Sequence, residues 1–405
     1  MVEQRASQTG SKPSILFVSL SLERGGTERH LALILPRLQD LGWPVSIYCL
    51  ATKGEMAPLV TLSGVEVIAP PFEGSAWFKG PTKAFRLLST SLKLLWLMVS
   101  RRPGIVHLFL PAPYLIGGPL ALLTLRPICI MSRRNLNHYL SKRPLAARFE
   151  LLLHRCVDAI LANSASIVSE LINEEGCDPN NVGLIRNGIE IDSFTGGAER
   201  NATRKLLGID DKAFVAIIVA NLIEYKGHAD LIHALSAIQT RMPEGWIVLF
   251  AGKDYGAGEE INALIIENGL GDHIRLLGSR RDIPDLLEAA DVGLLCSHEE
   301  GFSNSVLEGM AANLPMIVTN VGGNSEAVRS GLDGLVVPPH SPQELGEAIL
   351  SLALDPDRRQ KMGQSAGERV ATHFSIETCV KSYDRIYRGL LDGQSAAKLA
   401  PHEFF

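Results

Sequence analysis

The stretch SILFVSLSLERGGTERHLALILPRLQDL, residues 14–41, contains the pattern on which the fold prediction rests. Its first part, Ser14–Leu20, is a short apolar run bounded by polar residues, which is typical of a buried β-strand. Gly25 and Gly26 follow, and a helical pattern covers Thr27–Leu41. A buried strand that leads through glycines into a helix is the start of an α/β unit.

The same alternation continues along the chain. Further short apolar runs in the first half are VSIYCL, VEVIA, IVHLFL, PICIMS and DAILANS, with helical stretches between them. In the second half the pattern starts again with AFVAIIVAN, GWIVLFAG, HIRLLGS, DVGLLCS, LPMIVTN and GLVVP. Strands that alternate with helices favour a parallel sheet covered on both faces. The sequence therefore predicts an α/β protein with two units of similar size.

The length of 405 residues is also too great for one ordinary core, so two domains are expected. We place the N-terminal domain at 13–187, a soft polar linker at 188–205 and the C-terminal domain at 206–374. An amphipathic helix is expected at 375–391. Residues 392–405 are expected to form a frayed tail.

Composition limits the classes of protein that need to be considered. The six cysteines stand at 49, 129, 156, 177, 296 and 379 without a CxxC pair, which favours reduced thiols in a cytosolic protein. The N-terminal MVEQRASQTGSKP lacks the apolar core of a signal peptide. The most apolar helical candidate, Lys83–Arg102, contains Arg86 and Lys93 and is a poor membrane span.

Charge is distributed unevenly between the two halves. Residues 1–160 contain 19 Lys and Arg against 9 Asp and Glu, a balance of +10, and the remainder contains 20 against 35, a balance of −15. A basic front half suits anionic lipid head groups or a phosphorylated acceptor. The alternative is that scattered surface charges only keep the domain soluble. Nucleic acid is not expected as a partner, because no basic run is interleaved with aromatic residues.

The stretch EGFSNSVLE, residues 300–308, is the best indication of function. Glu300 and Glu308 lie eight residues apart, a little over two helical turns. A helix that starts at about Ser303 would leave Glu300 in the preceding loop and place Glu308 inside the helix. Each carboxylate can accept two hydrogen bonds from a diol, and the first amides of the helix favour a diphosphate. A diol, a diphosphate and a second diol describe a nucleotide sugar.

Other candidate site residues follow predicted strands, where ligands bind in doubly wound sheets. Gly25 and Gly26 allow a backbone to approach a ligand, or form a plain turn. Lys226 in NLIEYKGHADLI can neutralise a phosphate as a point charge, or is a solvated surface lysine. His107 lies at the end of IVHLFL and is either a site residue or a core histidine.

Arg133 and Arg134 follow PICIMS and are candidates for contact with an acceptor phosphate, with a solvated basic pair as the alternative. No Ser/His/Asp grouping, metal-spaced His/Cys cluster or GxxxxGK[ST] loop is present in the sequence, so no metal site is predicted.

These motifs together resemble the retaining glycosyltransferases of family 4. The stretch SHEEGFSNSVLEGMAANLPMIVTNVGGNSEAVRSGLDGLVVP is similar to the signature region of that family. GGTERHLALILPRLQDLGWPV resembles its opening GG-x-E helix, ANLIEYKGHADLI its K-G loop and LIRNGIEIDSF its N-G-I-D segment. The resemblance covers nearly the whole length, and the E-x7-E stretch with its downstream glycine pair is its most specific part.

The resemblance implies the GT-B fold, in which two Rossmann-like domains face each other across a cleft and the C-terminal helix crosses back to the N-domain. It implies that Glu300 holds sugar hydroxyls, Glu308 the ribose diol and Lys226 the diphosphate, with His107 near the donor sugar. We therefore predict Glu300, Lys226 and His107 as catalytic residues. The predicted donor-binding residues are Gly26, Asn221, Lys226, Glu300, Gly301, Phe302, Ser303, Asn304, Ser305 and Glu308. The acceptor-binding candidates are Arg133 and Arg134.

The chain departs from the family pattern at three places. Asn221 stands where the family often has the arginine of R-x4-K, and Arg24, Arg186 and Arg280 are candidates for the missing cation. His107-Leu108-Phe109 replaces the HxH motif, and Glu190 replaces the aspartate of N-G-I-D.

The predicted activity is a retaining, metal-independent transfer of a hexose or N-acetylhexosamine from a nucleotide-diphosphate sugar to a glycan or lipid-linked hydroxyl in polysaccharide biosynthesis. No cofactor is expected, and a UDP-sugar is favoured over a GDP-sugar as co-substrate. The alternatives are a nucleotide-sugar 2-epimerase and a non-catalytic nucleotide-sugar-binding module. The expected location is the cytoplasm, and peripheral contact of the basic N-domain with the inner face of an anionic membrane is an open alternative.

Overall fold

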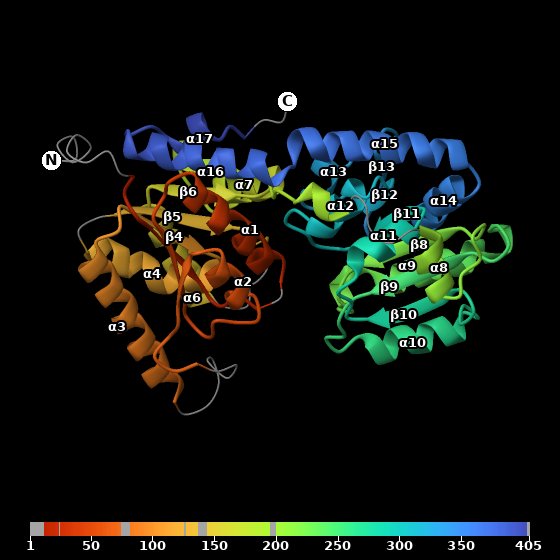
Figure 1. Cartoon of the computed structure of the whole chain (residues 1–405), viewed down its shortest axis with the longest axis horizontal. Coiled ribbons are helices and arrows are strands. Elements are labelled where there is room, and N and C mark those ends of the chain that lie inside the picture. Colours follow the sequence, from red (N-terminus) through yellow and green to blue (C-terminus); the bar gives the residue numbers. More distant parts are fainter. Residues whose placement is uncertain are drawn as a thin grey trace. The chain divides into compact units, whose positions relative to one another are not determined.

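The computed structural model describes residues 12–23, 25–73, 82–124, 127–136, 144–194 and 200–402. The chain divides into two compact units. The first contains Met1–Arg186 together with Glu377–Phe405, and the second is the continuous segment Asn187–Ile376. Each unit is a parallel β-sheet with helices on both faces (Figure 1). This is the predicted α/β class, and each unit is described by itself below.

The first unit has a seven-stranded sheet in the order β3-β2-β1-β4-β5-β6-β7, and all of its strand pairs are parallel. The buried strands are nearly continuous apolar runs, as expected where helices cover both faces. The strands are β1 (Ile15–Ser19), β2 (Val45–Cys49), β3 (Glu66–Ile68), β4 (Ile105–Phe109), β5 (Ile128–Arg133), β6 (Ala159–Ala162) and β7 (Val182–Leu184). The helices are α1 (Gly26–Asp40), α2 (Ala57–Leu62), α3 (Lys83–Arg101), α4 (Pro111–Leu123), α6 (Pro144–His154) and α7 (Ala165–Ser169).

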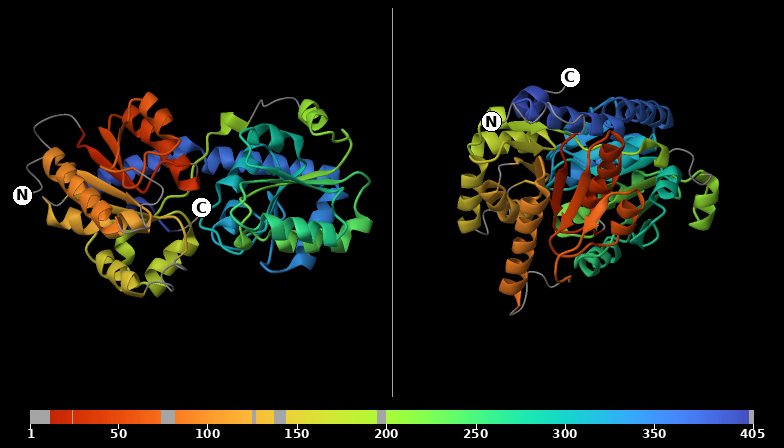
Figure 2. Two further views of the ribbon diagram at one scale, coloured as in Figure 1. Left: turned by 90° about the horizontal axis from the view of Figure 1, so that it is seen from below. Right: turned by 60° about the vertical axis from the view of Figure 1, so that its left-hand side comes forward.

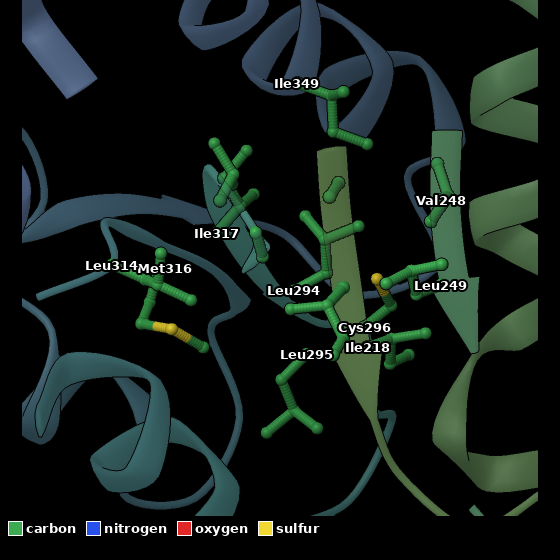
Figure 3. Packing of buried hydrophobic residues seen from close by; sticks show 14 of the residues in the cluster. Ile218, Val248, Leu249, Leu294, Leu295, Cys296, Leu314, Met316, Ile317 and Ile349 are labelled. Atoms are coloured by element: carbon green, nitrogen blue, oxygen red, sulfur yellow. The ribbon is translucent and has the colours of Figure 1, made fainter. Parts of the chain in front are cut away.

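The second unit has a six-stranded parallel sheet in the order β10-β9-β8-β11-β12-β13. Its strands are β8 (Val215–Val219), β9 (Ile247–Ala251), β10 (Ile274–Gly278), β11 (Val292–Leu295), β12 (Met316–Thr319) and β13 (Gly334–Val337). Its helices are α8 (Arg200–Leu206), α9 (His228–Ile238), α10 (Gly258–Glu267), α11 (Ile283–Ala289), α12 (Asn304–Ala311), α13 (Asn324–Ala327), α14 (Pro342–Ala353) and α15 (Pro356–His373). Figure 3 shows part of its core, where Ile218, Leu294 and Ile317 from three neighbouring strands pack with Ile349 of α14.

The C-terminal helix α16 (Ile376–Leu391) belongs almost entirely to the first unit. Tyr383 and Tyr387 on this helix are buried, and their rings lie 5.9 and 5.8 Å from the ring of His107 in β4. Asp384 accepts hydrogen bonds from the Trp43 indole at 2.8 Å and from Lys12 at 3.0 Å. The apolar face of the predicted amphipathic helix therefore completes the core of the N-terminal sheet.

Two of the predicted boundaries need correction. The segment predicted as a linker, 188–205, is part of the second unit as far as it is described, because Ile189 and Phe194 are buried in its core. Arg204 of α8 is fully buried and donates to the carbonyl oxygens of Ala289 and Ala213 at 2.9 Å each. These contacts attach the segment to the second sheet.

The segment predicted as a frayed tail, 392–405, is described by the structure up to residue 402, and this part is not frayed. It contains α17 (Ala396–Leu399), whose residues Ala396 and Leu399 are buried. The amide of Leu184 in β7 donates to the carbonyl of Ala400 at 3.0 Å. Burial and this backbone bond fix the end of the chain against the edge of the first sheet. Residues 403–405 lie outside the described part.

Within the described residues, no helix is both long and apolar enough to cross a bilayer.

Candidate active site

Most of the predicted site residues lie at the carboxyl edge of the second sheet. β8 and β11 are neighbours there, and the strand order reverses between them because β9 and β10 lie on the other side of β8. Open α/β sheets bind ligands at such a switch point. Lys226 ends a short 3-10 turn after β8, and Glu300 lies in the loop after β11. The fold therefore brings together two residues that are 74 positions apart.

Lys226 and Glu300 form an ion pair at this edge. The ammonium nitrogen of Lys226 lies 2.5 Å from Oε1 of Glu300, and the two side chains are 17% and 11% exposed. Ser297 Oγ donates to the same carboxylate oxygen at 2.7 Å. The Ser297 carbonyl accepts from Thr319 Oγ1 at 2.5 Å. A carboxylate fixed in this way beside an ammonium offers acceptors for sugar hydroxyls next to a cation for a phosphate.

The glycine pair at 322–323 allows this loop to pack tightly. Gly322 has φ +52°, and a Cβ placed there would lie 1.9 Å from the carbonyl oxygen of Glu300. The Gly323 amide donates to the Gly301 carbonyl at 2.6 Å. Only glycine suits a left-handed position with backbone so close. The predicted association of Glu300 with the downstream glycine pair therefore has a steric basis.

Gly227 has a similar function beside Lys226. Its φ is +70°, and a Cβ there would lie 2.0 Å from the carbonyl oxygen of Cys296, the residue after β11. The next residue, His228, is buried at the start of α9, and burial together with the charge of Lys226 lowers its pKa to about 4. His228 is therefore neutral at pH 7 and adds no charge to the site.

The start of α12 follows Glu300 after a loop of three residues. The helix begins at Asn304 with Ser303 as its N-cap, in agreement with the prediction of a start at about Ser303. The Ser303 side chain makes no capping bond to the helix and instead lies 3.0 Å from Ser305 Oγ. The first amides of a helix have no acceptor within the helix, and the helix dipole favours an anion there. This end of α12 can thus receive a phosphate.

Asn187 fixes the loop before α12. Its side-chain amide donates to the carbonyl of Phe302 at 2.8 Å and to Oδ1 of Asn304 at 2.7 Å. Phe302 is buried, and its ring lies 5.4 Å from that of Phe374. The asparagine of the predicted N-G-I-D segment therefore has a positioning function beside the donor residues. Gly301 is also buried at this point of the loop.

Glu308 lies inside α12, as predicted, and is only 5% exposed. Ribose binding by Glu308 stays a prediction.

Asn221 stands where the family often has an arginine, and the structure shows which residue contacts it. Asn221 is exposed after β8, and its Oδ1 accepts a hydrogen bond from the backbone amide of Lys253 at 3.1 Å. Lys253 is exposed in the loop after β9, the strand next to β8. Among the earlier candidates, Arg280 is paired with Asp282 at 2.8 and 2.5 Å. Lys253 is therefore a basic residue that contacts Asn221 through its backbone amide, and its ammonium nitrogen lies 5.1 Å from the centroid of the Tyr255 ring.

The other two candidates for the missing cation are less informative. Arg24 lies outside the described residues. The backbone carbonyl of Arg186 accepts from Cys379 of α16, within the first unit.

In the first unit, Gly26 is the first residue of α1, the helix that follows β1 after a six-residue loop, and is exposed. Its N-cap Gly25 has no side chain to cap the helix. This agrees with the predicted local structure of a strand, a glycine pair and a helix start. Its contact with a donor remains a prediction.

His107 does not have the surroundings predicted for a catalytic residue. It lies within β4, is fully buried, and both ring nitrogens are hydrogen-bonded, Nδ1 to Tyr387 Oη at 2.7 Å and Nε2 to Ser132 Oγ at 2.8 Å. Burial, followed by the charge of Arg134, lowers the pKa of His107 well below its usual value. We conclude that His107 anchors α16 to the sheet, and the predicted contact with the donor sugar has no support here.

Arg133 is also a core residue. Its guanidinium is fully buried between Glu150, at 2.8 Å, and Glu175, and His154 Nε2 lies 2.8 Å from Glu175. The acceptor role predicted for Arg133 is therefore wrong in this structure, because both carboxylates hold its charge inside the unit.

Arg134 is 9% exposed and faces α16, with Nη1 3.5 Å from Tyr383 Oη. This places Arg134 against the C-terminal helix, and its acceptor role stays a prediction.

The sequence analysis did not identify Ser297, Thr319 and Lys253. Each residue stands at the end of a strand or within two residues of one, in the same kind of connection after a strand from which Lys226 was selected. Applying that criterion to every strand of the second sheet would have included all three.

Comparison with known proteins gives consistent matches along the chain. The family model "Glycosyltransferase Family 4" matches residues 24–193, and "Glycosyl transferases group 1" matches residues 199–369. The D-inositol 3-phosphate glycosyltransferase of Corynebacterium urealyticum is 29% identical over 396 residues, with 91% of each chain covered. The protein of the same name from Kribbella flavida is 27% identical, with 92% of this chain and 93% of the relative covered.

Solved structures are similar over the same length. Anabaena HepE in complex with UDP has a TM-score of 0.79 and 20% identity, with 93% of this chain and 100% of that chain covered. Sucrose-phosphate synthase from Thermosynechococcus elongatus has a TM-score of 0.80 and 19% identity, with 95% and 100% covered. At these identities the likeness concerns the fold.

Proposed function

The chain belongs to the group 1 glycosyltransferases of family 4, enzymes of the GT-B fold, and from this premise we propose the reaction that it catalyses. It transfers a hexose or N-acetylhexosamine from a nucleotide-diphosphate sugar to a hydroxyl of a glycan or lipid-linked acceptor. The anomeric configuration is retained, and the chemistry needs no metal ion.

The observation that supports this proposal is the Lys226–Glu300 pair beside the start of α12. The ammonium, the carboxylate and the helix terminus offer a cation, hydroxyl acceptors and amide donors in one place. These are the groups that a sugar joined to a diphosphate requires. On donor binding, Lys226 exchanges its contact with Glu300 for the diphosphate, and Glu300 accepts hydrogen bonds from the sugar.

The reaction needs electrostatic stabilisation more than a nucleophile. Negative charge grows on the diphosphate as the sugar–phosphate bond breaks, and fixed donors and cations stabilise that charge. Lys226 and the amides at the start of α12 supply this stabilisation. The acceptor hydroxyl attacks from the face that the diphosphate leaves, and the departing phosphate takes the hydroxyl proton. Lys253, beside Asn221, supplies the second positive charge for the nucleotide.

A UDP-sugar is the favoured donor. HepE, which has a similar fold, has been crystallised in complex with UDP-glucose, with a TM-score of 0.79. The curated relatives are named for transfer to D-inositol 3-phosphate. A donor and acceptor panel should therefore begin with UDP-glucose and D-inositol 3-phosphate, followed by GDP-sugars and lipid-linked acceptors.

The test is transfer by Lys226→Ala and Glu300→Ala variants. Loss of a transition-state donor typically costs about 3–4 kcal/mol, so kcat/KM of Lys226→Ala should fall by roughly 100- to 1000-fold. Removing the charged acceptor at Glu300 should cost about 1.5–3 kcal/mol, roughly 10- to 150-fold. The matched controls are Lys361→Ala and Glu259→Ala, exposed positions in the same unit, which should keep wild-type activity.

Near wild-type transfer by both site variants would refute the site assignment. Conversion of the donor without an acceptor would instead indicate a 2-epimerase. Donor binding without turnover on the whole panel would indicate a binding module. Transfer that persists with excess EDTA would support the metal-independent mechanism, and its complete loss would contradict it.

The proposed function includes contact of the first unit with an anionic membrane surface. Helix α3 has two apolar faces. Thr90, Leu94, Leu97 and Met98 are buried against the unit, whereas Phe85, Leu88, Leu92, Trp96 and Val99 are 53–61% exposed. The exposed residues are spaced three or four apart, so they form one stripe opposite the buried face.

Several further observations favour a bilayer as the partner of this stripe. α3 contains four basic residues and no acidic residue, and one of the four, Arg101, is paired with Glu66. Phe72, which is 46% exposed, lies next to Phe85 with their ring centroids 5.4 Å apart and extends the apolar surface. Figures 1 and 2 show α3, coloured orange, along the outside of the first unit. Apolar residues with an interfacial tryptophan and flanking basic charge are typical of a helix that lies on anionic lipid.

A further inference from the structure

Three side chains with metal-ligating atoms meet at the carboxyl edge of the second sheet, beside the donor site but outside it. Asp230 lies in the first turn of α9, His298 in the loop after β11, and His340 in the loop between β13 and α14. The carboxylate and imidazole atoms of these residues all lie within 4.8 Å of one another. They come from three separate connections of the sheet, so their sequence spacing gave no indication of a cluster.

The distances suit a single small metal ion. Nε2 of His298 lies 2.9 Å from Oδ2 of Asp230, and Nδ1 of His340 lies 4.0 Å from the same oxygen. A tetrahedral zinc ion with bonds of about 2.0–2.1 Å separates its ligand atoms by about 3.3–3.4 Å. The observed separations lie on either side of that value. Each needs to change by less than about 1 Å, within the freedom of an exposed side chain such as His340.

The three residues differ in how firmly they are held. Asp230 and His298 are only 21% and 22% exposed, and the His298 amide donates to the Tyr225 carbonyl at 2.7 Å. His340 is 67% exposed, and its imidazole lies 3.8 Å from that of His298, measured between ring centroids. Two ligands are therefore set in place, and the third can close on an ion from the solvent side.

From this geometry we propose that Asp230, His298 and His340 bind one transition-metal ion of the zinc class, with the fourth position left to water. Two imidazoles and one carboxylate suit Zn²⁺, Ni²⁺ or Cu²⁺, whereas Mg²⁺ and Ca²⁺ prefer oxygen ligands alone. The bound ion joins the loop that carries Glu300 to the start of α9, which follows Lys226. It thereby reduces the mobility of the two loops of the donor site without contacting the donor.

This inference is independent of the proposed reaction, because it is tested without substrate. Tag-free protein is titrated with ZnCl2, and the midpoint of thermal unfolding and the zinc content after gel filtration are measured. We expect one equivalent of bound zinc. A zinc concentration of about 100 times the dissociation constant should raise the midpoint by about 5–10 °C. MgCl2 at the same concentration should give no shift.

The decisive variant is His340→Gln, because His340 is exposed and its replacement should leave the fold intact. This variant and His298→Gln should lose stoichiometric zinc and at least about nine-tenths of the midpoint shift. The control is His233→Gln, an exposed histidine on α9, which should keep both. Zinc content in His340→Gln equal to that of the wild type, or no retained zinc in the wild type, would overturn the proposal.

Discussion

Gly322 controls how closely two loops of the donor site approach each other. Gly322→Ala adds a Cβ that would lie 1.9 Å from the Glu300 carbonyl oxygen at a left-handed φ of +52°. The loop that carries Glu300 must therefore move. We expect kcat/KM for transfer to fall at least about tenfold, because catalytic groups lose rate steeply when displaced by about 1 Å.

Gly331→Ala is the matched control for this substitution. Gly331 has φ +85° with no atom within 4 Å of the added Cβ. Its replacement should cost about 1–2 kcal/mol of backbone strain and leave transfer unchanged. Equal activities of the two variants would contradict the packing function assigned to Gly322.

For single residues, the sequence could predict which of them follow strands, but it could not predict which side chains surround each of them in the fold. Lys226 and Glu300 were predictable because both stand after strands that are adjacent in the sheet. His107 and Arg133 were misassigned because their partners, Tyr387 and Glu175, lie 280 and 42 residues away. Asp230, His298 and His340 were missed for the same reason.

The outer stripe of α3 gives a prediction for a single helix. A Leu92→Glu, Trp96→Glu double variant places two charges in the apolar stripe. Wild-type protein should sediment with vesicles of phosphatidylcholine and phosphatidylglycerol, and more weakly as salt is raised. The double variant should bind at least about tenfold more weakly, because each buried apolar side chain contributes about 1.5–3 kcal/mol.

Leu206→Glu is the control for this experiment, since Leu206 is 87% exposed on α8 in the second unit. It should bind these vesicles like the wild type. Unchanged binding by the double variant, or no binding by the wild type, would exclude α3 as the membrane contact.

Periodicity predicted most elements but missed one short helix. α12 begins at Asn304, one residue after the predicted start. The start could be predicted closely because a strand, a loop with a glycine and a helix-forming run follow one another in the sequence. The C-terminal α17 was missed, because a four-residue helix has too few positions to show a period and is fixed by its contacts with β7.

For the whole molecule, we expect the buried histidines to make the free energy of unfolding fall in acid. Burial holds the pKa of His30 and His107 well below the usual value and lowers that of His228 to about 4. The unfolded chain takes up these protons near pH 6.5 and the folded chain does not, so acid favours unfolding. Each buried histidine should remove up to about 1.4 kcal/mol of stability per pH unit below about 6.5.

Denaturant unfolding measured at pH 7, 6 and 5 tests this expectation. His228 contributes between about pH 6.5 and 4. Stability should fall steadily over the measured range, and His228→Leu should reduce the slope for the second unit. His233→Gln, at an exposed position, should leave the slope unchanged. A free energy of unfolding that does not depend on pH between 7 and 5 would contradict the neutral state of these residues.

The first unit contains residues from both ends of the chain, so the ribosome completes it last. The ribosome delivers Tyr383 and Tyr387 roughly 200 residues after the N-terminal sheet has left it, which takes about 10–40 s at ordinary rates. During that interval the second unit, which is the continuous segment Asn187–Ile376, is still being synthesised. The surface that will receive α16 is exposed meanwhile, so the nascent chain offers chaperones an apolar binding site that the finished protein conceals.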